Sequence, residues 1–460
     1  MTQAEQHYRH MTETPVEKLI LSLSVPTIVS MLISNIYNLA DTYFVGTLGV
    51  SASGAVGVVF TLMSLLQAFG FMLGHGAGSV VSRLLAQRDV DAASRYVSTS
   101  FFLAVGLGAL VALAGIPLST PLMRLMGSTE TILPYARSYG LYILAAAPAL
   151  VGSLVLNNVL RYEGKAFYGM IGLGLGGVLN IIGDPICIYL FDMGIAGAGL
   201  ATALSQVVSL AVLLFLFRRH AQSRLSIKNF AREGHTILDI VTTGFPNLFR
   251  QGLTSVSSGI LNNCAGAFGD AAVSAMAITN RCQFFMFSVA LGIGQGFQPV
   301  AGFNYQARKY ARLRRAFRFT LTSALCVLAA VCAAGAAFAP QIVRLFQSDP
   351  EVLRIGALAL RFASASLLFT PLNIAPNMLF QTCGLKGRAM LLAGLRGGLC
   401  FIPLLLILPP MLGLLGVQLS QPIADVLTAL LSAPFAVHFF HHIPREDMHV
   451  AADDFGDDAA

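Results

Sequence analysis

The chain has 460 residues, of which 55% are hydrophobic and only 11% are charged. Soluble domains are roughly 25% charged, so this composition excludes an ordinary soluble protein and places the chain in lipid. The formal net charge of +7 does not indicate nucleic-acid binding, because the basic residues are scattered between long apolar blocks.

The first 17 residues are polar and are predicted to form a cytoplasmic N-terminal segment. They lack the basic start, apolar middle and small-residue cleavage site of a signal peptide. We therefore expect the first apolar helix to serve as its own insertion signal.

Twelve apolar blocks follow. A bilayer core about 30 Å thick requires about 20 mostly apolar residues per helix. The sequence predicts spans near 18–46, 53–81, 95–119, 135–159, 166–191, 195–217, 237–265, 273–303, 316–338, 355–381, 389–411 and 415–440. The predicted fold class is an all-α integral membrane protein with 12 transmembrane helices.

Lysine and arginine are distributed unevenly between alternate connections. One side carries 22 of them, including Lys386, Arg388 and Arg396, and the other side carries only five. Cytoplasmic loops carry the excess of basic residues. We therefore predict a multi-pass protein of the cell inner (cytoplasmic) membrane with both termini in the cytoplasm.

The chain also repeats itself. Shifting the sequence by 220 residues aligns Pro26 with Pro246, Gly46 with Gly266, Gly74 with Gly294 and Arg88 with Arg308. One offset held over about 100 residues indicates a duplication. With six spans per half, both halves enter the membrane from the same side, as a parallel repeat about an axis along the membrane normal. The predicted organisation is an N-lobe at 18–220, a cytoplasmic linker at 221–236, a C-lobe at 237–441 and a cytoplasmic tail at 442–460, with a cavity between the lobes.

Three carboxylates lie inside predicted spans, where a charge is costly and usually marks an ion or substrate path. Asp41 follows Tyr37 by four residues and Asp184 follows Asn180 by four, so each pair shares a helix face. Carboxylate, amide and hydroxyl oxygens suit a hard cation such as Na⁺, and two nearby acids also suit a proton. The third acid, Asp425, is as readily explained as a structural hydrogen-bonding group.

Arg250 and Arg281 are the matching intramembrane charges of the second half. They either snorkel or pair with carbonyls, or they form a positive wall for anionic groups of a substrate. The sequence has no phosphate-binding G-x-x-x-x-G-K-[ST] loop, so an ion gradient is the simpler energy source. No catalytic constellation is visible, so we do not expect an enzyme, and we expect no cofactor apart from the coupling ion.

Several segments resemble one transporter family. The segments are VPTIVSMLISNIYNLADTYFVGTLG at 25–49, NIIGDPICIYLFDMGIAGAGLATALSQ at 180–206 and GIGQGFQPVAGFNYQARKY at 292–310. They are similar to the prokaryotic multidrug and toxic compound extrusion (MATE) family of the flippase (MOP) superfamily. The resemblance implies two lobes in a V shape that alternate access and export bulky, often cationic drugs or metabolites in exchange for Na⁺ or H⁺.

The same resemblance implies roles for particular residues. It assigns the N-lobe cation site, which would also be the metal site if the ion is Na⁺, to Asp41, Asn180, Asp184 and Thr202. It places Tyr37, Tyr139 and Asn157 near that site or the substrate cavity. Pro26 is expected to allow bending of the first helix, and Glu163 to help close the inner gate.

One departure bears on the substrate. Some relatives have a second acidic site in the other lobe. In this chain the membrane-spanning part of the block at 237–265 contains Arg250 and no acid. A lipid-linked oligosaccharide or related lipid flippase is therefore the alternative function, and an integral membrane enzyme is a distant third. The expected partners are a small-molecule substrate and membrane lipids, without nucleic acid, for a monomeric protein.

Overall fold

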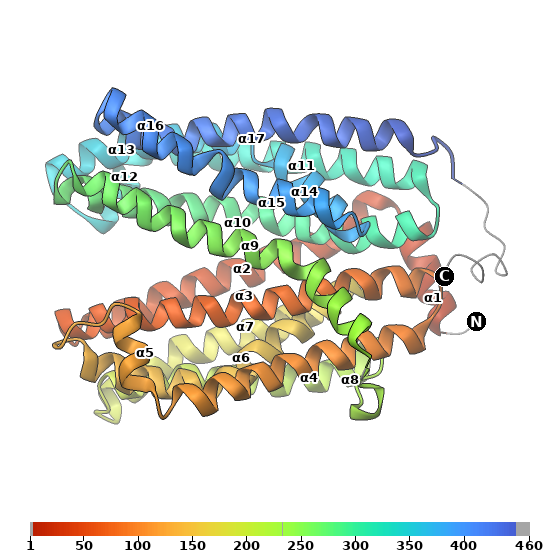
Figure 1. Ribbon diagram of the computed structural model, residues 1–460, viewed down its shortest axis with the longest axis horizontal. Helices are drawn as coiled ribbons and strands as arrows, with labels where there is room; N and C mark the ends of the chain where they lie inside the picture. Colours follow the sequence, from red (N-terminus) through yellow and green to blue (C-terminus); the bar gives the residue numbers. More distant parts are fainter. Residues whose placement is uncertain (1–2, 232, 448–460) are drawn as a thin grey trace. The chain divides into compact units, whose positions relative to one another are not determined.

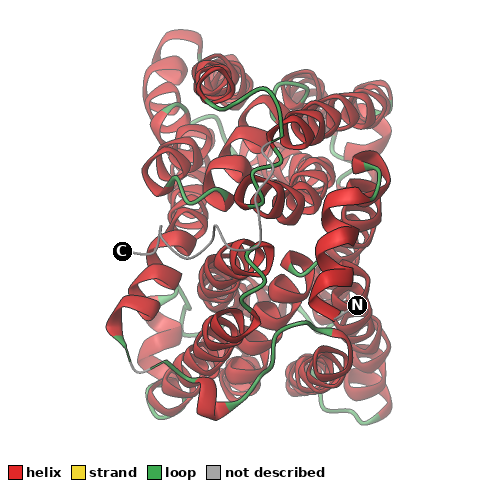
Figure 2. Cartoon of the chain, turned by 90° about the vertical axis from the view of Figure 1, so that its right-hand side faces the viewer, coloured by secondary structure: helices red, strands yellow, loops and turns green. Residues whose placement is uncertain are grey.

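The protein is helical throughout the part that the structure describes. In the computed structural model, residues 3–231 and 233–447 are described, and all regular elements within them are helices, without a strand (Figure 2). The predicted all-α fold class is confirmed.

The helices of the first half are α1 (Gln3–Glu13), α2 (Val16–Gly46), α3 (Val50–Ala86), α4 (Val90–Gly115), α5 (Ser119–Leu125), α6 (Leu133–Tyr162), α7 (Ala166–Pro185), the π-helical η1 (Ile186–Leu190), α8 (Ile195–His220) and the 3₁₀-helical η2 (Ile227–Asn229).

The second half contains α9 (Gly234–Gly266), α10 (Asp270–Gln306), α11 (Tyr310–Ala337), α12 (Ala339–Phe346), α13 (Pro350–Leu367), α14 (Pro371–Thr382), α15 (Lys386–Gly394), the π-helical η3 (Leu395–Leu399), α16 (Phe401–Leu412) and α17 (Leu414–His442).

All twelve predicted blocks coincide with helices. Within the described residues, ten helical segments are individually long and apolar enough to cross a membrane, and α13 with α14 forms one further, bent span. The remaining block, α9, is 33 residues long but is not among them. Its many Thr, Ser, Asn and Gly residues lower its hydropathy.

The bent span breaks at a proline. The axes of α13 and α14 differ by 51°, and Pro371 is the first residue of α14. Proline has no backbone N–H and disfavours helical geometry in the residue before it, so an uninterrupted helix cannot pass through this position without a kink.

The fifth span of each half contains a π-helical turn. In the first half η1 follows Asp184 and Pro185, and in the second half η3 contains Arg396. Such turns occur mostly at functional positions, where they redirect side chains within a helix. Each turn therefore lies next to a charged residue inside the apolar segment.

The chain forms two compact units. One holds Val29–Gly244 with the N-terminal residues up to Tyr8, and the other holds Arg9–Ile28 with the chain from Phe245 onward. Three helices contribute to both units: α1 passes from one unit to the other after Tyr8, α2 after Ile28 and α9 after Gly244. The bounds given for the lobes, the linker and the tail stay predictions.

Close helix contacts fix the core of the first unit. Helix α6 packs against α3, α4, α7 and α8, and α3, α4 and α6 run lengthwise beside one another (Figure 1). On α3, Gly70, Gly74 and Gly78 face Leu154, Asn158 and Tyr162 of α6. A Cβ on any of the three glycines would lie less than 3.0 Å from an α6 side chain, so only glycine permits this approach.

Candidate functional site

Asp41 is the buried acid of α2, in the part of that helix that belongs to the first unit. Its residue surface is 7% exposed, and its Oδ2 accepts a hydrogen bond from the Tyr139 hydroxyl on α6 at 2.8 Å. Its Oδ1 is buried and has no hydrogen-bond partner among the residues that the structure describes. One oxygen of this carboxylate is thus held in place, whereas the other accepts from none of those residues.

Asn180, Asp184 and Thr202 form a second buried group, on α7 and α8. The Asn180 amide nitrogen donates to Asp184 Oδ1 at 3.2 Å and to Thr202 Oγ1 at 3.0 Å. The spacing of four residues on α7 produces the first contact, as expected for one helix face. The other oxygens of the two α7 side chains, Asn180 Oδ1 and Asp184 Oδ2, are buried and have no partner within the described part of the chain.

Tyr139 connects the two groups, and Tyr37 lies near Asp41. Tyr139 interacts with Asp41, Asp184 and Thr202, and Tyr37 interacts with Asp41. Tyr139 lies so close to α8 that a Cβ on Gly199 would be 3.0 Å from its ring. The small residue at 199 therefore allows α8 to bring Thr202 to Asn180 and Tyr139.

The arrangement leaves three buried oxygens, Asp41 Oδ1, Asn180 Oδ1 and Asp184 Oδ2, that accept no hydrogen bond from residues 3–231 or 233–447. Buried polar atoms are normally satisfied, so an unsatisfied set calls for an explanation such as an ion. Oxygen donors of this kind are suited to a proton or a hard cation. Among the described residues no three His, Cys, Asp or Glu side chains gather as in a transition-metal site.

Other residues of the expected site lie outside this group. Asn157 is half-buried and packs against Gly169 at the start of α7. Pro26 is buried within α2, in the part of that helix that belongs to the second unit. On α10, Arg281 is exposed, whereas Arg250 on α9 is half-buried and donates to Asn247 Oδ1 at 3.2 Å.

Glu163 is buried at the end of α6, and its carboxylate holds the segment that follows α8 through hydrogen bonds. Its carboxylate accepts from the backbone N–H groups of Gln222 at 2.5 Å and Ser223 at 3.2 Å, and from the Ser223 hydroxyl. Burial raises the pKa of Glu163 above its ordinary value, although these three donors act in the opposite direction. The contacts all lie within the first unit.

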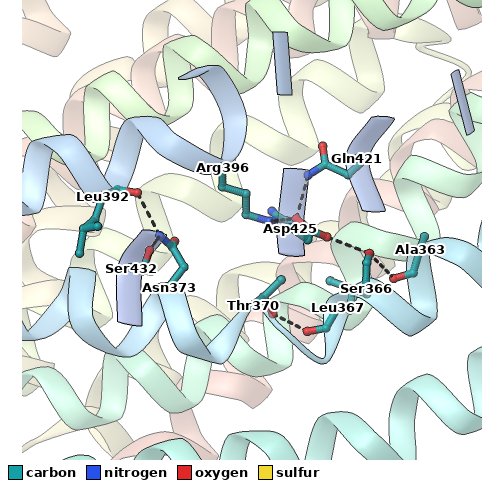
Figure 3. Close-up of polar contacts among 10 residues, drawn as sticks. All are labelled: Ala363, Ser366, Leu367, Thr370, Asn373, Leu392, Arg396, Gln421, Asp425 and Ser432. Carbon is teal, nitrogen blue, oxygen red and sulfur yellow. Dashed lines mark hydrogen bonds and ion pairs between the residues drawn. The ribbon is translucent and has the colours of Figure 1, made fainter. Parts of the chain in front are cut away.

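The second unit contains an intramembrane ion pair that the sequence analysis missed. Arg396 of η3 and Asp425 of α17 are joined by an Nε–Oδ1 contact of 2.8 Å (Figure 3). Gln421 donates to the same carboxylate at 2.9 Å and Ser366 at 3.0 Å, so Asp425 has three donors. The Arg396 guanidinium also lies 4.2 Å from the centre of the Phe287 ring.

The expected position of Arg396 was wrong. Arg396 was expected among the basic residues of a cytoplasmic connection, but it lies inside the apolar segment Lys386–Leu412. A signal was present, because Arg396 is the only charged residue of the block at 389–411 and Asp425 the only one at 415–440. Lone opposite charges in consecutive spans indicate a pair, since each is costly in lipid alone.

Comparison with known proteins identifies the family. The MatE family model matches twice, at residues 26–186 and 246–407, one match in each half of the repeat. Multidrug export protein MepA of Staphylococcus aureus is 27% identical over 428 residues, which cover 93% of this chain and 94% of MepA.

Solved structures agree with that family. The outward-facing conformation of a multidrug resistance MATE family transporter of the MOP superfamily superimposes with a TM-score of 0.90 and 28% identity, over 96% of this chain and 99% of that one. A MOP superfamily transporter from Pyrococcus furiosus is described as having a binding pocket of reverse polarity. It superimposes with a TM-score of 0.89 and 27% identity, over 96% of this chain and 99% of that one. The chain belongs to the MatE family of multi-pass membrane transporters and is a transporter rather than an enzyme.

Proposed function

We propose that this transporter exports bulky amphipathic, often cationic drugs or metabolites in exchange for Na⁺ or H⁺. The coupling ion binds in the first unit, between Asp41 of α2 and the group formed by Asn180, Asp184 and Thr202. The similarity to multidrug export proteins supports the substrate class.

The unsatisfied oxygens carry this proposal. Two carboxylates buried in one unit repel each other, and each charge is costly in an interior of low dielectric. A proton or a Na⁺ ion removes part of that cost by binding Asp41 Oδ1 or Asp184 Oδ2. The site therefore has a higher affinity for a cation than the same groups would have in water.

Tyr139 couples the two groups. Its hydroxyl donates to Asp41 Oδ2, so it stabilises the charged form of that acid. When Asp41 takes up a proton, this charge-assisted bond weakens, which changes the contact between α2 and α6. Loading of the ion and the position of α2 are linked in this way.

Alternating access requires an element whose two arrangements the ion and the substrate favour differently. Helix α2 is suited to this role because it passes from one unit to the other after Ile28, two residues beyond Pro26. A proline removes one backbone hydrogen bond and allows a kink. Glu163 keeps the connection after α8 in place at the cytoplasmic end of α6 during this motion.

The second candidate function is a lipid-linked oligosaccharide or related flippase. It is favoured by Arg250 of α9, which interacts electrostatically with Arg396 and supplies positive charge inside the second unit. Arg250 would accept an anionic group of a substrate, and Arg281 would act nearer the protein surface. We further propose that both termini are cytoplasmic and that the transporter acts as a monomer.

The test is efflux of a fluorescent cationic dye from proteoliposomes under an imposed Na⁺ or H⁺ gradient. The proposal predicts that Asp41→Asn and Asp184→Asn each abolish gradient-driven efflux. The gradient that drives the wild type identifies the coupling ion.

A matched control is available in the same unit. Asp192 is exposed and has a φ of 52°, a conformation that asparagine tolerates well, so Asp192→Asn makes the same chemical change outside the site. Efflux equal to wild type in the two site variants would overturn the ion site. Efflux of an anionic lipid-linked substrate, with no dye transport under either gradient, would favour the flippase.

A further inference from the structure

The second unit has a cavity of about 500 Å³ whose lining is dominated by arginine. One face of α11 forms most of it, from Ala311 to Thr322, and the start of α2 and the residue Arg445 beyond α17 complete it. At 1.5 Å rise per residue this face extends for roughly 16 Å. None of these residues belongs to the site described above.

The lining carries four arginines and one glutamate. Glu17 is paired with Arg315 at 2.6 Å, and Arg314 donates to backbone carbonyls at the end of α17, including that of Ile443 at 2.8 Å. Arg318 and Arg445 are exposed, and their side chains have no hydrogen bond or ion pair among the residues that the structure describes. The Asp447 carboxylate accepts from the backbone N–H of Ala311 at 2.9 Å and pairs with neither guanidinium group.

The position of this cavity along α11 indicates what binds there. The basic residues of α11 end at Arg318, and residues 319–337 contain no charged side chain. Nineteen uncharged, mostly apolar residues are about the length that crosses the hydrocarbon core. The guanidinium groups thus lie at the depth of the lipid headgroups.

Below the arginines the same helix face becomes apolar. Phe319 and Thr322 line the inner end of the cavity, and the exposed Cys326 and Val327 follow one turn further. An acyl chain can lie along this face while its headgroup remains among the arginines. A free anion would use the charges but not the apolar continuation.

We propose that this cavity binds the phosphodiester headgroup of an anionic glycerophospholipid through Arg318 and Arg445. A guanidinium donates two parallel hydrogen bonds to phosphate oxygens, which a zwitterionic lipid matches less well because its own ammonium competes. The bound lipid joins α2, α11 and α17, since Arg315 and Arg314 already hold the other two helices to this face. The site is independent of the transport mechanism proposed above.

The test is a binding measurement on the purified full chain in neutral detergent. Phosphatidylglycerol and phosphatidylcholine are titrated separately, and bound lipids are counted by native mass spectrometry. With about 1 kcal/mol for each arginine at a membrane surface, Arg318→Gln/Arg445→Gln weakens phosphatidylglycerol binding about thirtyfold and leaves phosphatidylcholine binding unchanged.

The matched control removes two exposed arginines of the other unit, as Arg95→Gln/Arg218→Gln, and keeps wild-type affinity. Ala311→Trp fills the cavity without a change of charge and is also expected to weaken phosphatidylglycerol binding. This variant keeps the proposal testable if the double arginine variant does not fold. Equal phosphatidylglycerol affinity in all four proteins would overturn the site. Displacement of the lipid by inorganic phosphate at an equal concentration would overturn the lipid assignment and indicate a free-anion site.

Discussion

The ion pair between Arg396 and Asp425 offers the sharpest test of the second unit. The Asp425 side chain is 0% exposed and the Arg396 side chain is 21% exposed, so the two partners differ in how tightly the protein encloses them. Arg396→Met leaves a fully buried carboxylate with Gln421 and Ser366 as its donors among the described residues. Asp425→Leu leaves a guanidinium that is less enclosed and keeps its contact with the Phe287 ring.

Breaking a buried pair by removing one partner costs about 3–5 kcal/mol, whereas replacing both partners by apolar residues is often neutral. We therefore expect Arg396→Met to lower the free energy of unfolding by about 3–5 kcal/mol and Asp425→Leu by less, because Arg396 is less buried than Asp425 and keeps its cation–π contact with Phe287. The double variant Arg396→Met/Asp425→Leu recovers most of the loss.

The measurement is equilibrium unfolding in mixed micelles. The chain has no tryptophan, so a thiol-reactive dye is the better probe, and the buried Cys332, Cys383 and Cys400 of the second unit report its opening. A double variant that loses as much as the two single variants together would refute the reasoning. It would mean that each side chain acts alone, without coupling across the pair.

Two further perturbations concern the first unit. Burial raises the pKa of Glu163 in the folded protein. The contribution of this carboxyl group to the free energy of unfolding is therefore largest near and below the ordinary glutamate pKa of about 4.3, and it decreases as the pH rises through the folded pKa. Glu163→Gln removes this pH dependence. The free energy of unfolding, measured against pH, should therefore fall less steeply above about pH 4.3 in the variant than in the wild type. Parallel curves for the two proteins would contradict a raised pKa of Glu163. Gly78→Ala places a Cβ 2.2 Å from the Tyr162 ring and should lower the free energy of unfolding by about 1–3 kcal/mol. The control Gly106→Ala has open space around the new Cβ and should leave the free energy of unfolding unchanged or slightly higher. An equal effect of the two alanines would contradict the close packing of α3 on α6.

The helices were predictable because an apolar span is a property of local sequence, and the repeat was predictable because matching residues recur at one constant offset of 220. A span requires only enough consecutive apolar residues to cross the bilayer, and all twelve predicted blocks are helical. The break between α13 and α14 was not predicted, although Pro371 was visible. A proline in a membrane helix is tolerated with or without a break, depending on which neighbours satisfy the freed backbone groups.

The local half of the ion site was also predictable. Asn180 and Asp184 are four residues apart on one helix, so their contact follows from helix geometry alone. Thr202 and Tyr139 were assigned through the resemblance to the MATE family, and nothing in the spacing of the chain indicated them. Their contacts with Asn180 and Asp41 cross between helices.

The sequence by itself determined the membrane location, the helical class, the duplication and the charged residues that need a partner. Only the tertiary structure decided which partner each one has: Tyr139 for Asp41, the backbone after α8 for Glu163, and Arg396 for Asp425. The physical reason is that hydropathy and helical periodicity act over a few turns of one helix. A pair between helices depends instead on their relative rotation and depth, which small residues such as Gly78 and Gly199 and the π-helical turns η1 and η3 set across the whole unit.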